Sequence, residues 1–498
     1  MSSIESLFTE FPFDDVLRRI GEVAKRERIE VYAVGGVVRD VLLGRMTTDI
    51  DFVSVGPGSG IRLAKALVAT MGGTIVHVYK NFGTAAIRVG HPATKDQLVL
   101  EFVGARKESY NRESRNPVVE EGTLEDDQKR RDFTINALAI DLHPDRYGHL
   151  IDPFGGVQDL GEGILRTPLD AVQTFDDDPL RIVRAARFAC QLGFQIDKPT
   201  LRGMRERSSR MNILSMERIA DEMQKIMSAD KPSIGFRILY ECGALQQFFP
   251  ELVALQGVET VEGVRHKDNF FHTLKVVDNL VESVSERSAS ETLWLRWAAL
   301  MHDIGKPRSK RFTEGIGWSF HGHEDKGARM IPKMFRRLKL PTDSRMDYVQ
   351  KLVSLHHRPV SLVDETVSDS AVRRLLFDAG EEIEDLMLLV RADITSKNPQ
   401  RVRKYLAAFD AVEAKFKEVE EKDHLRNFQP PVDGAEIMST LGLKPSRAVG
   451  MIKNRIREAI LDGDIPNDRD AAFDYMMQIK DAILAEWSKM DSSHTKEY

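Results

Sequence analysis

One stretch, residues 33–54, constrains this chain more than any other and reads AVGGVVRDVLLGRMTTDIDFVS. Gly35 and Gly36 follow a short apolar run, which predicts a strand, a tight turn and the start of a helix. Because glycine has no side chain, the backbone there can approach a phosphate group, and the free N–H groups of a starting helix point the same way. Arg39 would add a positive charge. The pattern predicts a phosphate-binding turn.

Two aspartates follow in the segment DIDF. Asp49 and Asp51 are two residues apart, so a strand would place both carboxylates on one face, as hard oxygen ligands for Mg²⁺. Taken singly, a glycine pair after a strand is usually a tight turn, and DxD is usually a solvated strand end. Together and in this order, they indicate two-metal phosphoryl transfer.

The stretch resembles the signature of the DNA polymerase β nucleotidyltransferase superfamily, in the form found in tRNA CCA-adding enzymes of the bacterial and eukaryotic class and in bacterial poly(A) polymerases. Further elements of that family follow in order over about residues 20–250. These elements are KRRDFTINALAID at 129–141, DPFGGVQDLGEGILR at 152–166, FDDDPLRIVRAARFACQLGF at 175–194 and SMERIADE at 215–222. One position departs from the family pattern, since Asp177 stands where the family usually has Glu.

The resemblance implies roles for particular residues. Asp49 and Asp51 would bind Mg²⁺ and carry the catalysis. Glu101, in the later apolar segment LVLEFV, is our candidate for a third catalytic carboxylate, with a strand-surface residue as the alternative. The expected nucleotide-binding residues are Gly35, Gly36, Arg39, Arg131, Asp132, Asn136, Asp178, Arg181 and Arg184.

Base selection can be argued from chemistry. On a helix, Asp178 and Arg181 would be neighbours on one face. Cytosine and adenine present an amino donor beside a ring-nitrogen acceptor, whereas uracil and guanine present a carbonyl beside a ring N–H. A carboxylate that accepts and a guanidinium that donates would match C and A and oppose U and G. The alternative is an ordinary salt bridge within the helix.

A second group of residues lies in the C-terminal half. His272, His302 with Asp303 in WAALMHDIGKP, and Asp393 repeat the order H, HD, D of the HD metal-dependent phosphohydrolase superfamily, which this part of the chain resembles. Imidazole and carboxylate together suit a divalent metal ion, and HD at a helix end supplies two ligands. Two further histidines could complete a second metal site or bind phosphate, namely His323 and His356.

The expected fold class is α+β, with a small mixed-sheet nucleotidyltransferase head followed by a long, nearly all-α body that includes an HD domain. Residues 106–128 are polar and without period, so we expect a mobile loop there. QPPVDG at 429–434 reads as a hinge into a last helical segment. The expected domains are a catalytic head at 1–160, a nucleotide-selecting and RNA-binding neck at 161–255, an HD domain at 256–400 and a tRNA-binding region at 401–498.

Composition excludes several protein classes. The chain has 498 residues, 42% of them hydrophobic and 30% charged, which is ordinary for a globular protein of several domains. No apolar run approaches 18 residues and the N-terminus is acidic, so we expect a cytoplasmic protein with no membrane contact. Cys190 and Cys242 form no CxxC pair and are expected to be core thiols.

Charge is distributed unevenly along the chain. The net charge of -6 argues against non-specific coating of nucleic acid. Residues 181–210 nevertheless carry eight Lys and Arg against two acidic residues. That segment is either a face for RNA or triphosphate, or a solvated helix surface.

The expected activity is addition of C and A, from CTP and ATP, to tRNA 3′ ends with Mg²⁺. A poly(A) polymerase and an A-only or C-only enzyme share every motif quoted, so they remain open. A third alternative is a chain whose main activity is HD-type hydrolysis. The resemblance implies that the HD domain holds a second divalent metal and acts on 2′,3′-cyclic phosphates and small phosphoesters. The alternative is a degenerate HD domain that merely supports tRNA. The sequence leaves the oligomeric state open.

Overall fold

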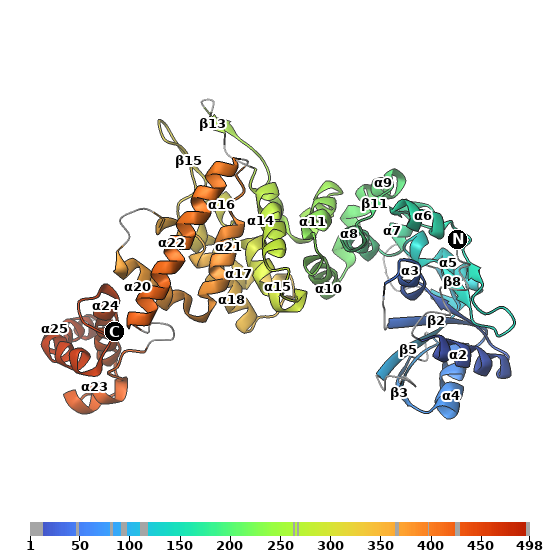
Figure 1. The fold of residues 1–498 in the computed structure, drawn as a ribbon, viewed down its shortest axis with the longest axis horizontal. Helices are drawn as coiled ribbons and strands as arrows, with labels where there is room; N and C mark the ends of the chain where they lie inside the picture. Colours follow the sequence, from blue (N-terminus) through green and yellow to red (C-terminus); the bar gives the residue numbers. More distant parts are fainter. Residues whose placement is uncertain are drawn as a thin grey trace. The chain divides into compact units, whose positions relative to one another are not determined.

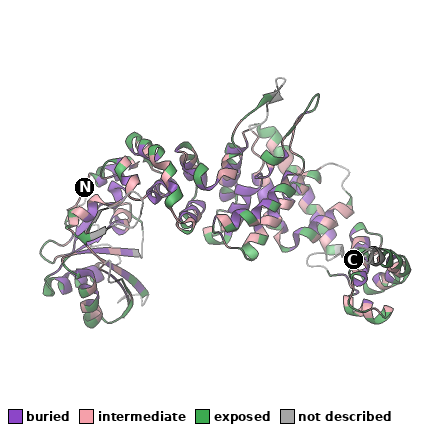
Figure 2. Cartoon of the chain, turned by 180° about the vertical axis from the view of Figure 1, so that it is seen from behind, coloured by how far each residue is buried: buried purple, intermediate pink, exposed green. Residues whose placement is uncertain are grey.

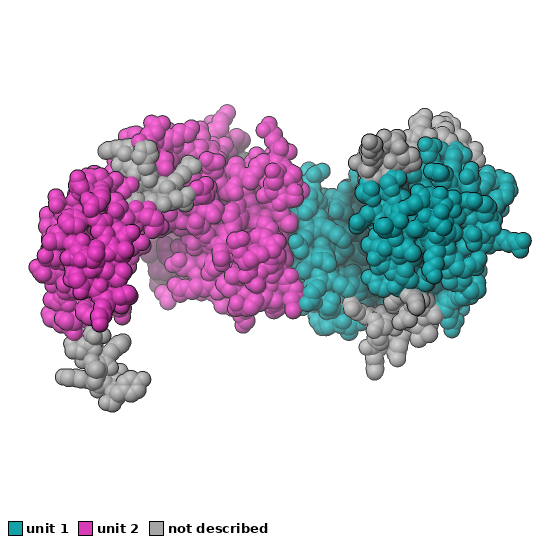
Figure 3. All heavy atoms as spheres, turned by 90° about the horizontal axis from the view of Figure 1, so that it is seen from below, with its two compact units in different colours: residues 1–253 teal, residues 254–498 magenta. Residues whose placement is uncertain are grey.

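The structure is a computed structural model that describes residues 13–45, 49–79, 83–90, 97–109, 118–261, 264–265, 268–363, 368–396, 398–423 and 429–494. The chain forms two compact units, residues 1–253 and residues 254–498, which Figure 3 shows in teal and magenta. The first unit holds a large sheet with helices, and the second is nearly all helix. The predicted α+β class is therefore confirmed.

The first unit is built on a seven-stranded sheet with the strand order β3-β4-β5-β2-β1-β8-β9 (Figure 1). β2 and β5 run parallel, and the other five neighbouring pairs are antiparallel, so the predicted mixed sheet is confirmed. Its strands are β1 (Glu30–Val34), β2 (Asp49–Val55), β3 (Thr74–Tyr79), β4 (Thr84–Gly90), β5 (Gln97–Gly104), β8 (Ala139–Asp141) and β9 (Leu150–Ile151).

Helix α4 (Ser59–Met71) covers one face of this sheet, with α2 (Asp14–Arg26) beside it. Leu63 and Leu67 lie one turn apart on α4 and are fully buried, as expected for the apolar stripe of a surface helix. Gly60 permits the close approach of this helix to the sheet, because a Cβ there would lie 2.5 Å from the carbonyl oxygen of Gly83. The short helix α3 (Gly36–Leu42) joins β1 to β2.

On the opposite face of the sheet, a buried apolar cluster lies over β1, β2 and β8. Tyr32, Val34 and Val53 form an apolar cluster there with Ala139 and Ala105. Farther along the same face, Arg88 on β4 and Val99 on β5 are exposed, so the apolar cluster leaves room for a site beside β2.

Residues 106–128 are expected to form a mobile loop, but the described parts, 106–109 and 118–128, contain regular structure. The expected loop contains a hairpin of β6 (Arg106–Ser109) and β7 (Val118–Glu121), followed by helix α5 (Leu124–Lys129). Arg106 and Lys107 on β6 and Glu120 and Glu121 on β7 are charged, and the two strands pair with each other rather than with the seven-stranded sheet. The segment therefore lacks the apolar alternation that reveals a half-buried strand. Thr123 caps α5 through a reciprocal capping box with Asp126.

Short helices complete the first unit, and α8 packs between α10 and α11. Its buried residues include Ile182, Val183 and Ala186. The helices are α6 (Gly156–Glu162), α7 (Ala171–Asp177), α8 (Leu180–Leu192), α9 (Lys198–Arg207), α10 (Met216–Met227), α11 (Pro232–Glu241), α12 (Ala244–Phe248) and α13 (Pro250–Val253), with 3₁₀ helices η2 (Thr134–Asn136) and η3 (Ser208–Ile213). Two short strands, β10 (Ile164–Leu165) and β11 (Gln195–Ile196), pair in parallel. Cys190 and Cys242 are buried free thiols, as predicted.

The second unit is a set of helices with two small hairpins, and its buried residues lie on the inward sides of the helices (Figure 2). The helices are α14 (Asn269–Ser283), α15 (Ala289–Met301), α16 (Lys306–Ser309), α17 (His323–Arg337), α18 (Ser344–Leu355), α19 (Arg358–Ser361), α20 (Asp369–Ala379), α21 (Ile383–Ala392), α22 (Pro399–Asp423), α23 (Gly434–Leu441), α24 (Arg447–Asp462) and α25 (Arg469–His494), with 3₁₀ helix η4 (Gly380–Glu382). The hairpins are β12 (Thr260–Val261) with β13 (Val264–Arg265), and β14 (Arg311–Thr313) with β15 (Gly317–Ser319).

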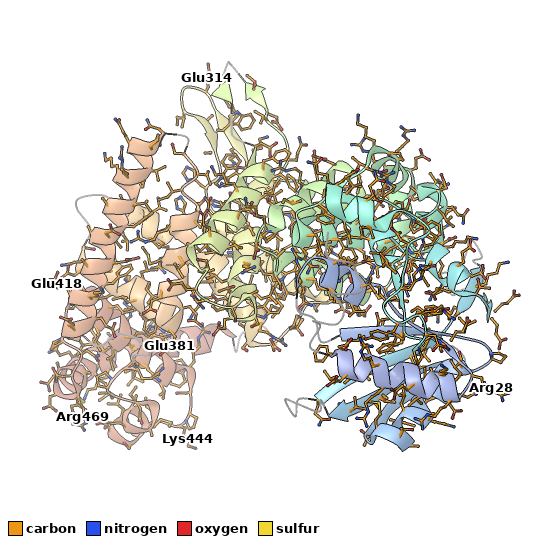
Figure 4. All side chains as sticks on the ribbon, turned by 45° about the vertical axis from the view of Figure 1, so that its right-hand side comes forward. Arg28, Glu314, Glu381, Glu418, Lys444 and Arg469 are labelled. Atoms are coloured by element: carbon orange, nitrogen blue, oxygen red, sulfur yellow. The ribbon has the colours of Figure 1, made fainter. Side chains whose placement is uncertain are left out.

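The last helices begin where the sequence predicts a hinge. Asp433, in QPPVDG, caps α23 by accepting a hydrogen bond from the backbone N–H of Glu436. Lys444, in the connection between α23 and α24, and Arg469, at the start of α25, are exposed (Figure 4). Among the helices that the structure describes, none combines the length and apolar character that crossing a bilayer requires.

Two candidate active sites

The first candidate site is a cleft of about 690 Å³ in the first unit, between the open part of the sheet and the helices α8 and α10. Among its described lining residues, nine are cationic and five are acidic. That excess of positive charge suits a polyanionic ligand such as a nucleoside triphosphate. The cationic residues are Arg39, Arg106, Arg130, Arg131, Arg181, Arg184, Arg187, Arg218 and Lys225, and the acidic residues are Asp40, Asp51, Glu101, Asp132 and Asp178.

Two carboxylates lie side by side on the floor of this cleft. Asp51 on β2 is the register partner of Glu101 on β5, and both residues are half-buried. Asp49 begins β2 two residues earlier, where strand alternation gives it the same face. Its side chain lies outside the described residues. Oxygen ligands from adjacent strands form a donor set that fits Mg²⁺, which would offset the repulsion between the two neighbouring carboxylates.

The predicted glycine turn stands beside these carboxylates. Gly35 has a φ of +75°, a conformation that favours glycine, and a Cβ there would lie 2.7 Å from Nη1 of Arg131. Helix α3 begins at Gly36. Arg39 on this helix donates from Nη1 to Oδ1 of Asn136 at 2.7 Å, and its guanidinium also pairs with Asp40.

Asp132 connects this turn to the neck helices. It accepts hydrogen bonds from Asn136 Nδ2 at 2.9 Å and from Arg184 Nε at 2.7 Å. Burial alone would raise the pKa of Asp132, but the positive charge of Arg184 and the Asn136 hydrogen bond lower it to about 2. Asp132 is therefore a buried anion at neutral pH. It contacts Arg184 directly and Arg39 through Asn136, and both arginines are predicted nucleotide-binding residues.

A second buried anion, Asp127, holds two of the cleft arginines. Arg131 donates to it from Nε at 3.1 Å and from Nη2 at 2.9 Å, and Arg130 pairs with its other oxygen. Burial raises the pKa of Asp127, but the charges of Arg131 and Arg130 lower it below its usual value. Both guanidinium groups are thereby fixed at the edge of the cleft.

The predicted helical pair of Asp178 and Arg181 is wrong in its geometry. Asp178 precedes α8 in an extended conformation, with φ −140° and ψ 102°, because the residue before Pro179 is disfavoured from helical angles. Its Oδ2 pairs with Arg218 Nη2 at 3.1 Å. Arg181 is buried and donates to the carbonyl oxygens of Arg130 and Thr174. Both Asp178 and Arg181 still line the cleft.

Several charged residues of the cleft lie outside the predicted nucleotide-binding set, although Arg187 belongs to the basic segment 181–210 that the sequence offers as a face for RNA or triphosphate. Arg218 lies in SMERIADE, a segment already matched to the family, so its charge could have been assigned to the site. Arg187 on α8 pairs with Glu222 on α10 at 3.0 Å and lies over the ring of Phe188. That contact joins residues 35 positions apart, for which the sequence holds no local signal.

The second candidate site lies in the second unit and gathers the six predicted HD residues from five parts of the chain. His272 lies on α14, His302 caps the C-terminus of α15 and is followed by Asp303, and Asp393 caps the C-terminus of α21. The two further histidines begin α17 and end α18, namely His323 and His356.

These side chains form two adjacent groups, one of His272, His302 and Asp393 and the other of Asp303, His323 and His356. His272 Nε2 lies 2.9 Å from Asp393 Oδ1, and His323 Nε2 lies 3.3 Å from Asp303 Oδ1. The second oxygen of Asp303 lies 3.2 Å from His302 Nε2, so this carboxylate spans both groups. Lys306 approaches the same oxygen at 2.6 Å.

The orientation of the imidazoles fits a metal ion. Three Nδ1 atoms lie within hydrogen-bond distance of backbone carbonyl oxygens: His302 of Ala299 at 2.7 Å, His356 of Val353 at 2.7 Å and His323 of Phe320 at 2.9 Å. Nδ1–H donation to these carbonyls leaves the Nε2 lone pairs directed into the cluster, which is how metal-binding histidines are held.

The charges in the cluster also favour a bound cation. His302 Nε2 is buried and has no hydrogen-bond partner among the described residues. Burial alone would lower the pKa of His302, but the Asp303 carboxylate raises it to about 10. The carboxylates therefore favour a cation here, either a proton on His302 Nε2 or a metal ion in place of that proton. The donor set of imidazole and carboxylate suits a divalent ion.

Comparisons with known proteins agree with this architecture. Residues 31–166 match the poly A polymerase head domain, 193–255 the probable RNA and SrmB-binding site of polymerase A, and 269–398 the HD domain. A multifunctional CCA protein of Tolumonas auensis is 34% identical over 385 residues, 76% of this chain and 87% of that protein. An A-adding tRNA nucleotidyltransferase of Deinococcus radiodurans is 31% identical over 452 residues, 88% of this chain and 93% of that protein.

The fold is also that of a solved enzyme. The Thermotoga maritima CCA-adding enzyme, solved with tRNA, superposes with a TM-score of 0.60 over 97% of this chain and 98% of that one, at 21% identity. The sequence relatives and the matched domains together confirm the predicted family. The chain belongs to the family of tRNA nucleotidyltransferases and poly(A) polymerases, with a head domain for nucleotidyl transfer and an HD domain in the same chain.

Proposed function

We propose that this enzyme adds C and A, taken from CTP and ATP, to the 3′ ends of tRNA by in-line attack of the RNA 3′-hydroxyl on the α-phosphorus, expelling pyrophosphate. The observation that carries the proposal is the pairing of Asp51 with Glu101 on the floor of a cleft lined by an excess of cations. The names of the relatives, multifunctional CCA protein among them, support the same reaction.

The residues of the cleft divide the work. Asp49, Asp51 and Glu101 would hold Mg²⁺, whose chemistry is to lower the pKa of the attacking hydroxyl and to neutralise the leaving group. The glycine turn gives the triphosphate close access to the backbone. The cations that would bind the phosphates are Arg39, Arg131 and Arg184.

Selection of C and A rests on Asp178 and Arg181, although they do not share a helix. Asp178 would accept from the exocyclic amino group, and Arg181 would donate to the ring nitrogen beside it. The contacts that hold each group support this role, because Arg218 orients the Asp178 carboxylate and two carbonyl oxygens orient the Arg181 guanidinium. A fixed pair can reject uracil and guanine, whereas a mobile pair could turn to suit them.

The test is incubation of the purified chain and Mg²⁺ with tRNA lacking its 3′ terminus. Each of the four nucleoside triphosphates is offered singly, and CTP is offered with ATP. Completion of CCA only with CTP plus ATP supports the proposal. Addition of A alone would assign the chain to the activity named for the Deinococcus radiodurans relative, and long A tails would make it a poly(A) polymerase. Absence of any addition would overturn the proposal.

We propose a second activity for the HD domain, hydrolysis of 2′,3′-cyclic phosphates and small phosphoesters at a divalent metal. The observation that favours it is the convergence of histidine Nε2 atoms and two carboxylates, with one buried Nε2 lacking a hydrogen-bond partner within the described structure. A divalent ion held by these residues would supply a nucleophile at neutral pH by lowering the pKa of a bound water. Removal of damaged tRNA ends would complement the addition of new ones.

We further propose that these roles divide as the sequence predicts, with the head at 1–160, the neck at 161–255, the HD domain at 256–400 and the tRNA-binding region at 401–498. Exposed Lys444, Arg447 and Arg469 support RNA contact in the last region. We place the protein in the cytoplasm, where tRNA and nucleoside triphosphates meet. Limited proteolysis followed by tRNA binding to each fragment tests this division.

A further inference from the structure

The edge strand β3 exposes large side chains beside the catalytic cleft. Tyr79 is 55% exposed and Val76 is 44% exposed, and the strand is open to solvent along most of its length. An exposed apolar edge strand can pair with other chains and aggregate, and exposed apolar side chains often mark an interaction site. The exposed side chains of β3 are therefore candidates for a binding role.

A β-bulge determines which face the aromatic residues of β3 occupy. Ile75 is opposite Ile87 on β4, but His77 is opposite Ala86, so Val76 is an extra residue. Without that extra residue, strand alternation would turn His77 and Tyr79 to the opposite face of the sheet. The bulge therefore places both rings on the face that carries the catalytic carboxylates.

Strand register connects these rings to the cleft. Asp51, Glu101, Ala86 and His77 form one row across β2, β5, β4 and β3. Tyr79 is opposite Thr84, and Thr84 lines the cleft. The row spans three strand spacings, about 14 Å, which a short single-stranded end can cover.

The two rings form one surface. His77 and Tyr79 have centroids 4.7 Å apart. Arg88 is exposed on the same face, in the neighbouring row with Thr74 and Val99. Tyr79 is exposed and His77 is half-buried. Accessible aromatic rings with a cation on the same face are the combination that binds single-stranded nucleic acid, with bases stacked on the rings and phosphates near the charge.

We propose that His77 and Tyr79 form a stacking surface for the unpaired 3′ nucleotides of the RNA primer. The proposal rests on the proposed function, because the primer 3′-hydroxyl must reach Asp51 and Glu101. The incoming nucleotide is assigned to Asp178 and Arg181 on the helical side of the cleft, which leaves the sheet side for the primer. The primer end changes after every addition, so a contact that serves each step has to tolerate different bases, as stacking does.

The test measures steady-state constants for tRNA lacking its 3′ terminus and for the nucleoside triphosphates. His77→Ala, Tyr79→Ala and the double variant are compared with Tyr79→Phe, which keeps the ring. Val78→Ala is the matched control, since Val78 lies on the same strand, is 36% exposed and faces the other side of the sheet. We expect Tyr79→Ala to raise KM for the RNA about 5- to 100-fold, with kcat and the nucleotide KM nearly unchanged. Tyr79→Phe and Val78→Ala should resemble wild type.

A binding experiment separates this proposal from the proposed function. Affinity is measured for the primer and for a primer with abasic terminal nucleotides. Wild type should lose affinity for the abasic primer, and the double variant should lose little more. Equal primer affinity of wild type and the double variant would overturn the stacking surface, as would a change in sedimentation without a change in RNA affinity, which would make β3 a pairing edge between chains. Absence of nucleotide addition by wild type would overturn the proposed function and leave the binding result to decide the surface.

Discussion

The carboxylates of Asp51 and Glu101 belong to adjacent parallel strands at the same register, so two like charges share the floor of one cleft. Like charges at neighbouring positions of a sheet are destabilising unless a cation lies between them. This arrangement favours metal binding over a structural role for Glu101, and it makes the role of Glu101 testable.

We expect Asp49→Ala and Asp51→Ala to lower nucleotide addition by several orders of magnitude, because the metal ligands are removed. Glu101→Gln should lower it by at least about tenfold if Glu101 is a third ligand. Melting temperatures should stay level or rise, since the charge repulsion is relieved. Single-turnover rates and thermal melts check this. A Glu101→Gln enzyme with the wild-type rate would make Glu101 a strand-surface residue.

Base selection is tested at the Asp178–Arg218 pair and at Arg181. We expect Asp178→Ala to weaken the preference for C and A over U and G more than it weakens triphosphate binding, since the proposed role of this carboxylate is to accept from the amino group of the base. Arg218→Ala should have a smaller effect of the same kind, because Asp178 remains but loses its partner at 3.1 Å. Misincorporation of UTP and GTP is the measurement, and Arg19→Ala is the control, since Arg19 is exposed on α2 and is not part of the cleft lining.

Arg181→Ala should affect stability as well as selection. Arg181 is buried and donates to the backbone carbonyls of Arg130 and Thr174, which would lose this donor, although the Thr174 oxygen would still accept from the backbone N–H of Asp178. Groups left unsatisfied in this way cost about 1–3 kcal/mol each. Urea denaturation measures the change. Unaltered selection in a stable Arg181→Ala enzyme would contradict its role in reading the base.

Asp132 predicts a pH dependence of stability. Its pKa is about 2 in the folded chain against 3.8 unperturbed, so the charged form stabilises the fold above pH 4 and this contribution is lost as pH falls toward 2. The shift corresponds to about 2 kcal/mol. Asp132→Asn should be destabilised at pH 7, where Arg184 loses its partner, and the gap to wild type should narrow between pH 4 and pH 2. Urea denaturation of both proteins across that range is the measurement, and a gap independent of pH would show that Asp132 is not a buried anion.

Much of this architecture could be predicted from the sequence because its motifs are local. The glycine turn, the DIDF strand and the HD pair each lie within a few residues, and the structure has β1, α3, β2 and α15 at those places. The hairpin within 106–128 could not be predicted, because its sequence lacks the apolar alternation of a half-buried strand. The extended conformation of Asp178 could be predicted from the sequence, because the residue before a proline is disfavoured from helical angles.

Other features depend on contacts between distant residues. Asp132 forms an ion pair with Arg184, which is 52 residues away in the chain. Asp127 pairs with Arg130 and Arg131 and is buried, and the sequence does not reveal that burial. The bulge at Val76 is also invisible in the sequence, because TIVHVY reads as a regular strand. Family resemblance could assign residues to the nucleotide, but only the fold shows which groups orient them.

The last prediction concerns the HD cluster. We expect the purified chain to retain a divalent ion and to hydrolyse a 2′,3′-cyclic phosphate, and Asp303→Ala to lose both, because its carboxylate spans the two groups of ligands. His323→Ala leaves the group of His272, His302 and Asp393 intact. It should therefore lower the bound metal by one ion if there are two sites, and leave it unchanged if there is one. Elemental analysis and a cyclic-phosphate assay measure this, with tRNA addition as the control that both variants should retain. Absence of metal in wild type, with equal hydrolysis by wild type and Asp303→Ala, would make the HD domain a structural support for tRNA.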